Sequence, residues 1–216
     1  MRTILCFGDS NTFGTNPKGG RHERKVRWPG CLAWLLGEDY YVIEEGMGGR
    51  TTVWEDPLEP NRCGIQYLPV ALQSHKPLDM VAVCLGTNDC KAHFKASPRM
   101  IAKGAERLVK TIQSFDYGAG VIAPKILLIS PVHIGEDVIH SPYASFDAES
   151  PEKSKALAKF YEEVARQYDC LYLDASKTAA CSSLDQLHMD EENHKKLAKA
   201  VKEVIEEYFS DRAGDK

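Results

Sequence analysis

The sequence predicts a single α/β domain, and three observations lead to that prediction. Five short apolar segments have the length and composition of buried strands, namely residues 3–7, 40–44, 80–85, 125–130 and 170–173. Between and after them, apolar residues recur at spacings of three and four, which indicates amphipathic helices. The chain has 216 residues, 43% of them hydrophobic and 27% charged, which suits one domain with a sizeable core.

Helix signals are clearest in the second half of the chain. Ser97 and Ser150 each precede a proline, so each pairs a capping hydroxyl with a proline at the first helical position. Asp190 precedes two glutamates and predicts a cap and an acidic first turn for the last helix. Helical spacing is shown by Leu157, Phe160, Tyr161, Val164 and Tyr168, and again by Leu197, Val201, Ile205 and Tyr208.

Strands that alternate with helices form βαβ units with right-handed crossovers, which produce a parallel sheet. We therefore expect a three-layer sandwich, with a flavodoxin-like five-stranded parallel sheet and helices on both faces. Residues 1–216 are expected to form this one domain, with 210–216 as a frayed tail. Two long irregular segments, 15–27 and 132–149, follow the first and fourth strands, and both are expected to overhang the crevice at the carboxyl ends of the strands.

Charge and composition exclude several classes of partner. The net charge of −4 argues against nucleic acid and anionic membrane surfaces, which need a basic excess. No segment approaches the roughly 18 apolar residues of a membrane span, and no signal-peptide-like segment is seen. Seven cysteines without repeating spacing indicate reduced thiols and a cytoplasmic protein. The histidines show no i, i+4 pair and no Cys-x-x-Cys motif occurs, so neither a metal site nor a cofactor is expected.

Ser10 is the candidate nucleophile. It lies in the sequence Gly8-Asp9-Ser10, where the first strand ends at the edge of the sheet that faces the crevice. The alternative role for such a serine is a strand-ending turn or a helix cap. Thr12 stands where a Gly-x-Ser-x-Gly elbow would have its second glycine, so an α/β-hydrolase assignment is not supported.

Asp185 and His188 form the candidate base and its orienting group. His188 comes three positions after Asp185, and both lie in a loop directly before an amphipathic helix. On one side of a turn, the carboxylate can reach one ring nitrogen and leave the other for Ser10. The alternative is a solvated loop histidine.

Two further segments supply candidate donors for an oxyanion. Asn88 follows the third strand, so its side-chain amide reaches the same edge of the sheet, although an asparagine there can also simply form a turn. Gly49 ends a glycine-rich segment after the second strand. That segment lacks the dinucleotide-binding pattern, and its better use is close approach of the Gly49 backbone N–H to an oxyanion.

In this order, the four segments resemble the SGNH (GDSL-type) hydrolase family. The four similar blocks are Gly8-Asp9-Ser10, Gly46-x-x-Gly49-x-Thr51, Gly86-x-Asn88-Asp89 and Asp185-x-x-His188, which together span nearly the whole domain. The resemblance implies that Ser10 is the nucleophile, His188 the base and Asp185 its orienting group. It also implies an oxyanion hole formed by the backbone amides of Ser10 and Gly49 with the Asn88 side chain.

The chain looks most like the arylesterase/acyltransferase branch of that family. The resemblance implies a serine esterase that hydrolyses short-chain acyl esters of small molecules, passes acyl groups to alcohols and forms a homo-oligomer. Two positions depart from the family pattern. Glu44 stands where the family usually has an asparagine, so the support of the Gly49 loop is expected to differ from the family pattern. Asn11 stands where the family usually has an apolar residue, so the floor of the pocket is expected to be altered.

Two other functions stay open from the sequence. One is an esterase of acetylated carbohydrates, with the same machinery and a more polar pocket. The other is a catalytically silent ligand-binding protein on the same fold, which would not need a serine, an asparagine, an aspartate and a histidine in this arrangement.

Overall fold

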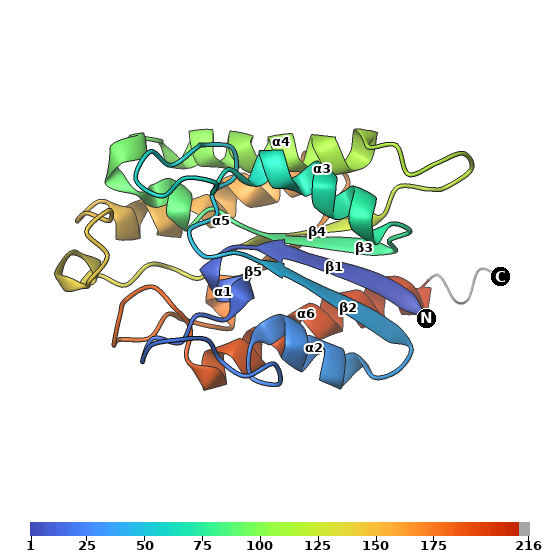
Figure 1. The fold of residues 1–216 in the computed structure, drawn as a ribbon, viewed down its shortest axis with the longest axis horizontal. Coiled ribbons are helices and arrows are strands. Elements are labelled where there is room, and N and C mark those ends of the chain that lie inside the picture. The colour runs from blue at the N-terminus through green and yellow to red at the C-terminus, as the bar shows by residue number, and fades with distance from the viewer. Residues whose placement is uncertain (212–216) are drawn as a thin grey trace.

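The computed structural model describes residues 1–211, and its centre is a five-stranded sheet (Figure 1). The strands are β1 (Arg2–Gly8), β2 (Tyr40–Gly46), β3 (Met80–Cys84), β4 (Lys125–Ser130) and β5 (Leu171–Asp174). They pair in the order β2-β1-β3-β4-β5, and every pair is parallel. This is the flavodoxin-like order, so the predicted sheet is confirmed.

Helices cover both faces of the sheet, as the three-layer prediction requires. The helices are α1 (Ser10–Phe13), α2 (Trp28–Leu36), α3 (Gly64–His75), α4 (Pro98–Ser114), α5 (Ser150–Gln167) and α6 (Glu191–Asp211). Figure 1 shows α3, α4 and α5 on one side of the sheet and α2 with α6 on the other. Helix α6 includes positions 210 and 211, which the sequence assigned to a frayed tail, and the remaining tail positions lie outside the described residues.

Alternation along the strands builds two separate hydrophobic cores. In β1, Leu5 and Phe7 pack with buried residues of α3, α4 and α5. Ile4 and Cys6 point to the other face and pack with α2 and α6, where Trp28 is fully buried. Because successive side chains of a strand point to opposite faces, a strand in the middle of such a sandwich is apolar throughout. The continuous apolar segments in the sequence follow from this arrangement.

The predicted helix starts are confirmed at two of three sites. The Ser97 hydroxyl accepts a hydrogen bond from the backbone N–H of Met100 at 3.3 Å, and the Asp190 carboxylate accepts one from that of Asn193 at 2.9 Å. The prediction for Ser150 is wrong, because α5 begins at Ser150 itself. Its backbone N–H donates to the carboxylate of Asp147, which therefore caps this helix from three residues upstream.

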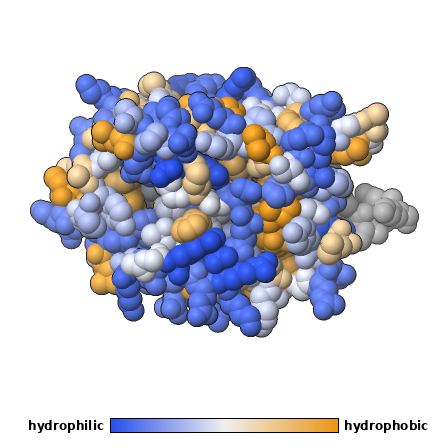
Figure 2. Space-filling model, in the orientation of Figure 1, coloured by the Kyte–Doolittle hydropathy of each residue, from blue (hydrophilic) through white to orange (hydrophobic). Residues whose placement is uncertain are grey.

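The described surface is mixed in character. Figure 2 shows polar side chains over most of one face, with a band of hydrophobic ones near the β2 edge of the sheet. Within residues 1–211, no helix combines the length and the apolar character needed to cross a membrane. All seven cysteines are free thiols, and five of them are buried.

The sheet order fixes where a ligand site belongs. All five strands end at the same edge, on the left in Figure 1. The chain runs from β1 to β2 on one side and then crosses back over β1 to β3 on the other, so the winding of the sheet reverses direction at β1 and β3. In open parallel sheets the crevice outside this switch point is the usual ligand site.

Candidate active site

Ser10 lies at the carboxyl end of β1 and begins the short helix α1. The turn before it is held by Asp9, whose carboxylate accepts the backbone N–H of Asn11 at 3.0 Å. Gly8 is required here because a Cβ would meet the Thr12 hydroxyl at 2.0 Å and the Cys84 carbonyl oxygen at 2.7 Å. The tight turn thus holds Ser10 at the strand end, where it lines a cleft of about 530 Å³.

His188 and Asp185 form a hydrogen-bonded pair. The distance from Nδ1 of His188 to Oδ2 of Asp185 is 2.7 Å. Oδ1 of the same carboxylate accepts the backbone N–H groups of His188 at 2.9 Å and Leu187 at 3.1 Å. Burial alone would raise the pKa of Asp185, but these hydrogen bonds outweigh it and lower the pKa. An ionised carboxylate at this distance favours the tautomer that carries its proton on Nδ1, in which Nε2 is the acceptor.

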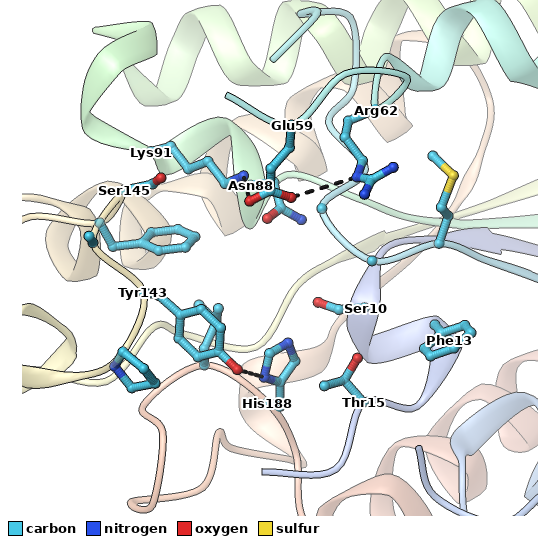
Figure 3. Close-up of a pocket in the computed structure, with 17 residues that line it drawn as sticks. Ser10, Phe13, Thr15, Glu59, Arg62, Asn88, Lys91, Tyr143, Ser145 and His188 are labelled. Atoms are coloured by element: carbon cyan, nitrogen blue, oxygen red, sulfur yellow. Dashed lines mark hydrogen bonds and ion pairs between the residues drawn. The ribbon is translucent and has the colours of Figure 1, made fainter. Parts of the chain in front are cut away.

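Figure 3 shows how the predicted residues share the cleft. The hydroxyl of Ser10 points into it, the ring of His188 lies beside that hydroxyl, and Asn88 points in from the opposite wall. Gly49 lines the same cleft. The structure thus brings together all four segments that the sequence singled out, although they lie far apart along the chain.

Two of the three candidate oxyanion donors, Gly49 and Asn88, lie on neighbouring loops of the cleft. Gly49 has φ +75°, a left-handed conformation that favours glycine. Among residues 1–211, no acceptor is paired with the backbone N–H of Gly49. Asn88 donates one amide hydrogen of Nδ2 to the backbone carbonyl of Arg50 at 3.1 Å. An amide nitrogen has two hydrogens, so the second remains for a ligand in the cleft.

Two buried ionisable side chains, Arg50 and Asp89, brace these loops, and the sequence reasoning missed both. Arg50 donates from Nη1 to the carbonyl of Gly8 at 2.8 Å and to that of Glu45, so it ties the loop to the ends of β1 and β2. Burial lowers the pKa of Arg50 to about 10. Asp89 accepts the backbone N–H of Thr52 at 2.9 Å and also its hydroxyl. No sequence pattern predicts the contacts of Arg50 with Gly8 or of Asp89 with Thr52, because each joins segments that are remote along the chain.

The long segment 132–149 forms one wall of the cleft, as expected. Its residues 142–146 line the cavity. The Tyr143 hydroxyl lies 3.3 Å from Nδ1 of His188, and the two rings meet edge-on with centroids 5.4 Å apart. Burial, followed by the charge of Asp185, raises the pKa of Tyr143. The sequence indicated this segment but gave no signal for the tyrosine.

The segment 15–27 contributes less to the cleft than expected. Thr15 lines the cavity, and the rest of the segment turns away from it. A bridge joins Thr15 to Arg21, and His22 packs edge-on against the buried His194 of α6. The segment therefore contacts β2 through Glu44, α6 through His194, and the loop of His188 through the contact of His22 with the Met189 carbonyl.

Charged side chains form the wall opposite Tyr143, and sequence reasoning also missed these. Lys91 is buried and contacts Asp56 at 2.8 Å and Glu59 at 3.2 Å. Arg62 faces Glu59 with 3.6 Å between nitrogen and oxygen. Lys91, Glu59 and Arg62 all line the cleft (Figure 3). This side of the cavity can therefore donate and accept hydrogen bonds.

Both unusual positions have defined contacts. Glu44 does not face the Gly49 loop, since it pairs with Arg27 and with Arg24, the latter at 3.1 Å. Support for that loop comes from Arg50 instead. Asn11 does not line the cavity, so the expected effect on the pocket floor is absent. Its side chain reaches the loop of His188.

Metal chemistry has no ready site among the described residues. Within positions 1–211, no group of three or more His, Cys, Asp and Glu side chains is arranged to hold an ion. The chemistry that the arrangement can perform is attack by a serine hydroxyl, assisted by a histidine–aspartate pair, at a carbonyl whose oxygen faces N–H donors.

The chain is similar to known proteins both in sequence and in structure. The sequence model of the GDSL-like Lipase/Acylhydrolase family matches residues 6–205. The chain is similar to the solved aryl esterase of M. smegmatis, with 37% identity, a TM-score of 0.89, and coverage of 96% of this chain and 99% of that one. No curated protein matches the sequence.

Two further solved structures are similar over nearly the whole chain. A carbohydrate acetylesterase family member from Sinorhizobium meliloti has 34% identity and a TM-score of 0.89, with coverage of 95% of this chain and 98% of that one. A putative arylesterase from Agrobacterium tumefaciens str. C58 has 33% identity and a TM-score of 0.88, with coverage of 96% and 99%.

Proposed function

This chain belongs to the GDSL-like lipase/acylhydrolase family, and we propose that it is a serine esterase that hydrolyses short-chain acyl esters through an acyl-enzyme on Ser10. The observation that best supports this proposal is the meeting of Ser10, His188, Asn88 and Gly49 in one cleft, with Asp185 bonded to the histidine behind it. A silent ligand-binding protein would have no need of that combination.

In the proposed acylation step, the Ser10 hydroxyl attacks the ester carbonyl carbon and Nε2 of His188 takes its proton. The imidazolium is stabilised by Asp185, whose carboxylate already contacts Nδ1. The backbone N–H groups of Ser10 and Gly49 and the free hydrogen of Asn88 Nδ2 donate to the developing oxyanion. When the tetrahedral intermediate collapses, His188 returns the proton to the leaving alcohol.

In the proposed deacylation step, the same groups work in reverse. His188 takes a proton from water, the hydroxide attacks the acyl carbon, and the Ser10 oxygen leaves with that proton. A bound alcohol can replace the water, and the product is then a new ester. Tyr143, which packs against the ring of His188, and Phe146 both line the cleft, and such apolar walls favour a bound alcohol over bulk water.

A specific observation favours a second candidate, an esterase of acetylated carbohydrates. Glu59, Arg62 and Lys91 present both donors and acceptors to the cleft, and a leaving group with several hydroxyls can use both. Two carbohydrate acetylesterase structures from Sinorhizobium meliloti are among the similar proteins. Glu59→Gln should raise KM for an acetylated sugar several-fold and leave KM for a phenyl ester unchanged.

We also propose that copies of the chain associate through the segments 15–27 and 132–149. Ile139 in the second segment is 54% exposed, which is more easily explained if a neighbouring copy covers it. Light scattering at micromolar concentration measures the mass directly. A value of 24.1 kDa, the mass of one chain, would contradict association.

The experiment that tests the main proposal is a screen of chromogenic esters of increasing acyl length, followed by acetylated sugars. Acetate and propionate esters should be turned over fastest, and the matched Ser10→Ala variant should be inactive in every assay. Binding of these esters without turnover by the wild-type protein would favour the silent binding protein.

A further inference from the structure

Asn11 follows the proposed nucleophile directly in the sequence, yet its side chain points away from the cleft. The residue is only 3% exposed. Its amide Nδ2 donates to the carbonyl oxygen of Leu187 at 3.2 Å, and its Oδ1 accepts the backbone N–H of Met189 at 2.9 Å. Leu187 and Met189 are the two residues that flank His188. One side chain therefore binds the backbone on both sides of the proposed base.

This contact joins the two halves of the proposed catalytic machinery. At its own end, Asn11 is anchored by a hydrogen bond from its backbone N–H to the Asp9 carboxylate at 3.0 Å. At the other end, the Asn11 side chain donates one hydrogen bond and accepts another, to backbone groups on either side of His188. Together they fix the distance of this loop from the turn of Ser10 and the tilt of the loop against that turn. The turn that holds Ser10 and the loop that holds His188 are thereby placed relative to one another through a single residue.

The other hydrogen bonds of the loop do not start from the turn of Ser10. The backbone N–H groups of Gly135 and Asp137 bond Gln186 at 2.8 and 3.3 Å, which ties the loop to the segment 132–149. Asp185 accepts the N–H of His188, and the N–H of Ser182 donates to the carbonyl of His188 at 2.7 Å. Both bonds lie within the loop, so they fix its shape rather than its distance from Ser10. His22 reaches Met189 from the segment 15–27, with Nε2 3.3 Å from the carbonyl oxygen. The bonds of Asn11 differ because they start from the turn of Ser10.

We propose that Asn11 is a positioning residue that sets the distance and angle between the Ser10 hydroxyl and Nε2 of His188. The inference rests on the proposed function, in which these two groups exchange a proton. Without Asn11 the loop keeps its internal bonds, and the Asp185–His188 pair stays intact but is no longer held against Ser10. Activation of the serine then slows, while ester binding is unaffected because Asn11 does not line the cleft.

The test uses a fluorophosphonate, which reacts with an activated serine: the Ser10 oxygen bonds to phosphorus, His188 takes the proton and fluoride leaves. The final stoichiometry of labelling counts competent sites, and the rate constant reports activation of the serine. The matched control is Tyr117→Phe, which removes another buried side-chain hydrogen bond, to the Ile112 carbonyl at the end of α4. Wild-type turnover and labelling of Ser10 test the proposed function separately.

For Asn11→Leu we expect complete labelling with a rate constant lowered by about 10- to 100-fold. The value of kcat should fall in parallel, with KM within about twofold and the midpoint of the pH profile unchanged, because the Asp185–His188 contact lies within the loop. If the leucine variant does not fold, Asn11→Ala leaves space for water to bond the two backbone groups and should show the same loss. If the labelling rate constant stays at the wild-type value while fewer sites are labelled, Asn11 has a purely structural role and the proposal is wrong. An equal fall of the labelling rate constant in Tyr117→Phe would also overturn the proposal.

Discussion

Asp185 holds His188 by two atoms at once, through the ring and through the backbone. Oδ2 lies 2.7 Å from Nδ1 of the ring, and Oδ1 lies 2.9 Å from the backbone nitrogen of the same residue. The carboxylate thus fixes both the orientation of the imidazole and the conformation of its loop. The same bonds lower the pKa of Asp185 against the opposing effect of burial, so the group is ionised at neutral pH.

Asp185→Asn should lower kcat by about 10³- to 10⁴-fold at neutral pH, because an amide can donate to Nδ1 and stabilise the wrong tautomer. In the wild type, kcat/KM should rise between pH 5 and 8, the range in which histidine bases lose their proton. The measurement is the pH–rate profile with a chromogenic acetate ester. A flat profile, or a variant with near-normal kcat, would exclude the histidine–aspartate pair as the base.

Asn88→Ala should lower kcat by about 10²- to 10³-fold with a smaller change in KM, because one oxyanion donor is lost in the transition state. The bond from Asn88 to the Arg50 carbonyl is lost as well, so thermal unfolding of the variant is the necessary control. Steady-state kinetics separate the two parameters. An effect confined to KM would instead make Asn88 a residue that binds the ground state.

His194 should make the protein sensitive to acid. It is fully buried, and burial together with the adjacent His22 lowers the pKa of His194 to about 3. In the unfolded chain the pKa of a histidine is about 6.5. Between these values the unfolded state binds a proton that the folded state does not, so the free energy of unfolding falls as the pH decreases below about 6.5.

Denaturant unfolding at pH 7.5 and pH 5 measures this effect. The wild type should lose about 2 kcal/mol more than His194→Gln over that interval. Glutamine keeps an acceptor for the backbone N–H of Trp28, which His194 accepts at 3.2 Å, but it cannot be protonated. Equal losses in the two proteins would show that His194 does not remain neutral in the folded state.

Acyl transfer should compete with hydrolysis when a primary alcohol is present. The reason is the aromatic part of the cleft, where the side chains of Tyr143 and Phe146 offer the apolar part of an alcohol a binding surface beside the acyl group. The ratio of new ester to free acid, measured at several alcohol concentrations in buffer, checks the expectation. If ester forms only in proportion to the alcohol's share of all nucleophiles, the protein is a simple hydrolase.

The sequence predicted the features that depend on local pattern. Each strand was located to within two residues at each end, because a buried parallel strand is apolar on both faces. Ser10 and Asn88 were placed at one edge because both directly follow strands of a parallel sheet. Asp185 and His188 were paired because a separation of three residues fits one turn, and the turn is present.

The rest depends on where loops lie in space, which spacing does not report. Lys91, Glu59 and Arg62 meet only after the chain between β2 and α3 folds back over the strand ends. The role of Asn11 was missed for the same reason, since its two partners lie more than 170 residues away. The Ser150–Pro151 pair does not reveal the true cap of α5, because the capping carboxylate belongs to Asp147, three residues before Ser150.

The most direct test of the account is the turnover number of Ser10→Ala with a chromogenic acetate ester. Ser10 lies at the end of β1 and contributes little to either core, so circular dichroism and thermal unfolding of the variant should match the wild type. The account predicts that kcat falls by at least about 10³-fold, as expected when the nucleophile is removed. Residual activity above about 1% of wild type, well above that range, would contradict Ser10 as the nucleophile.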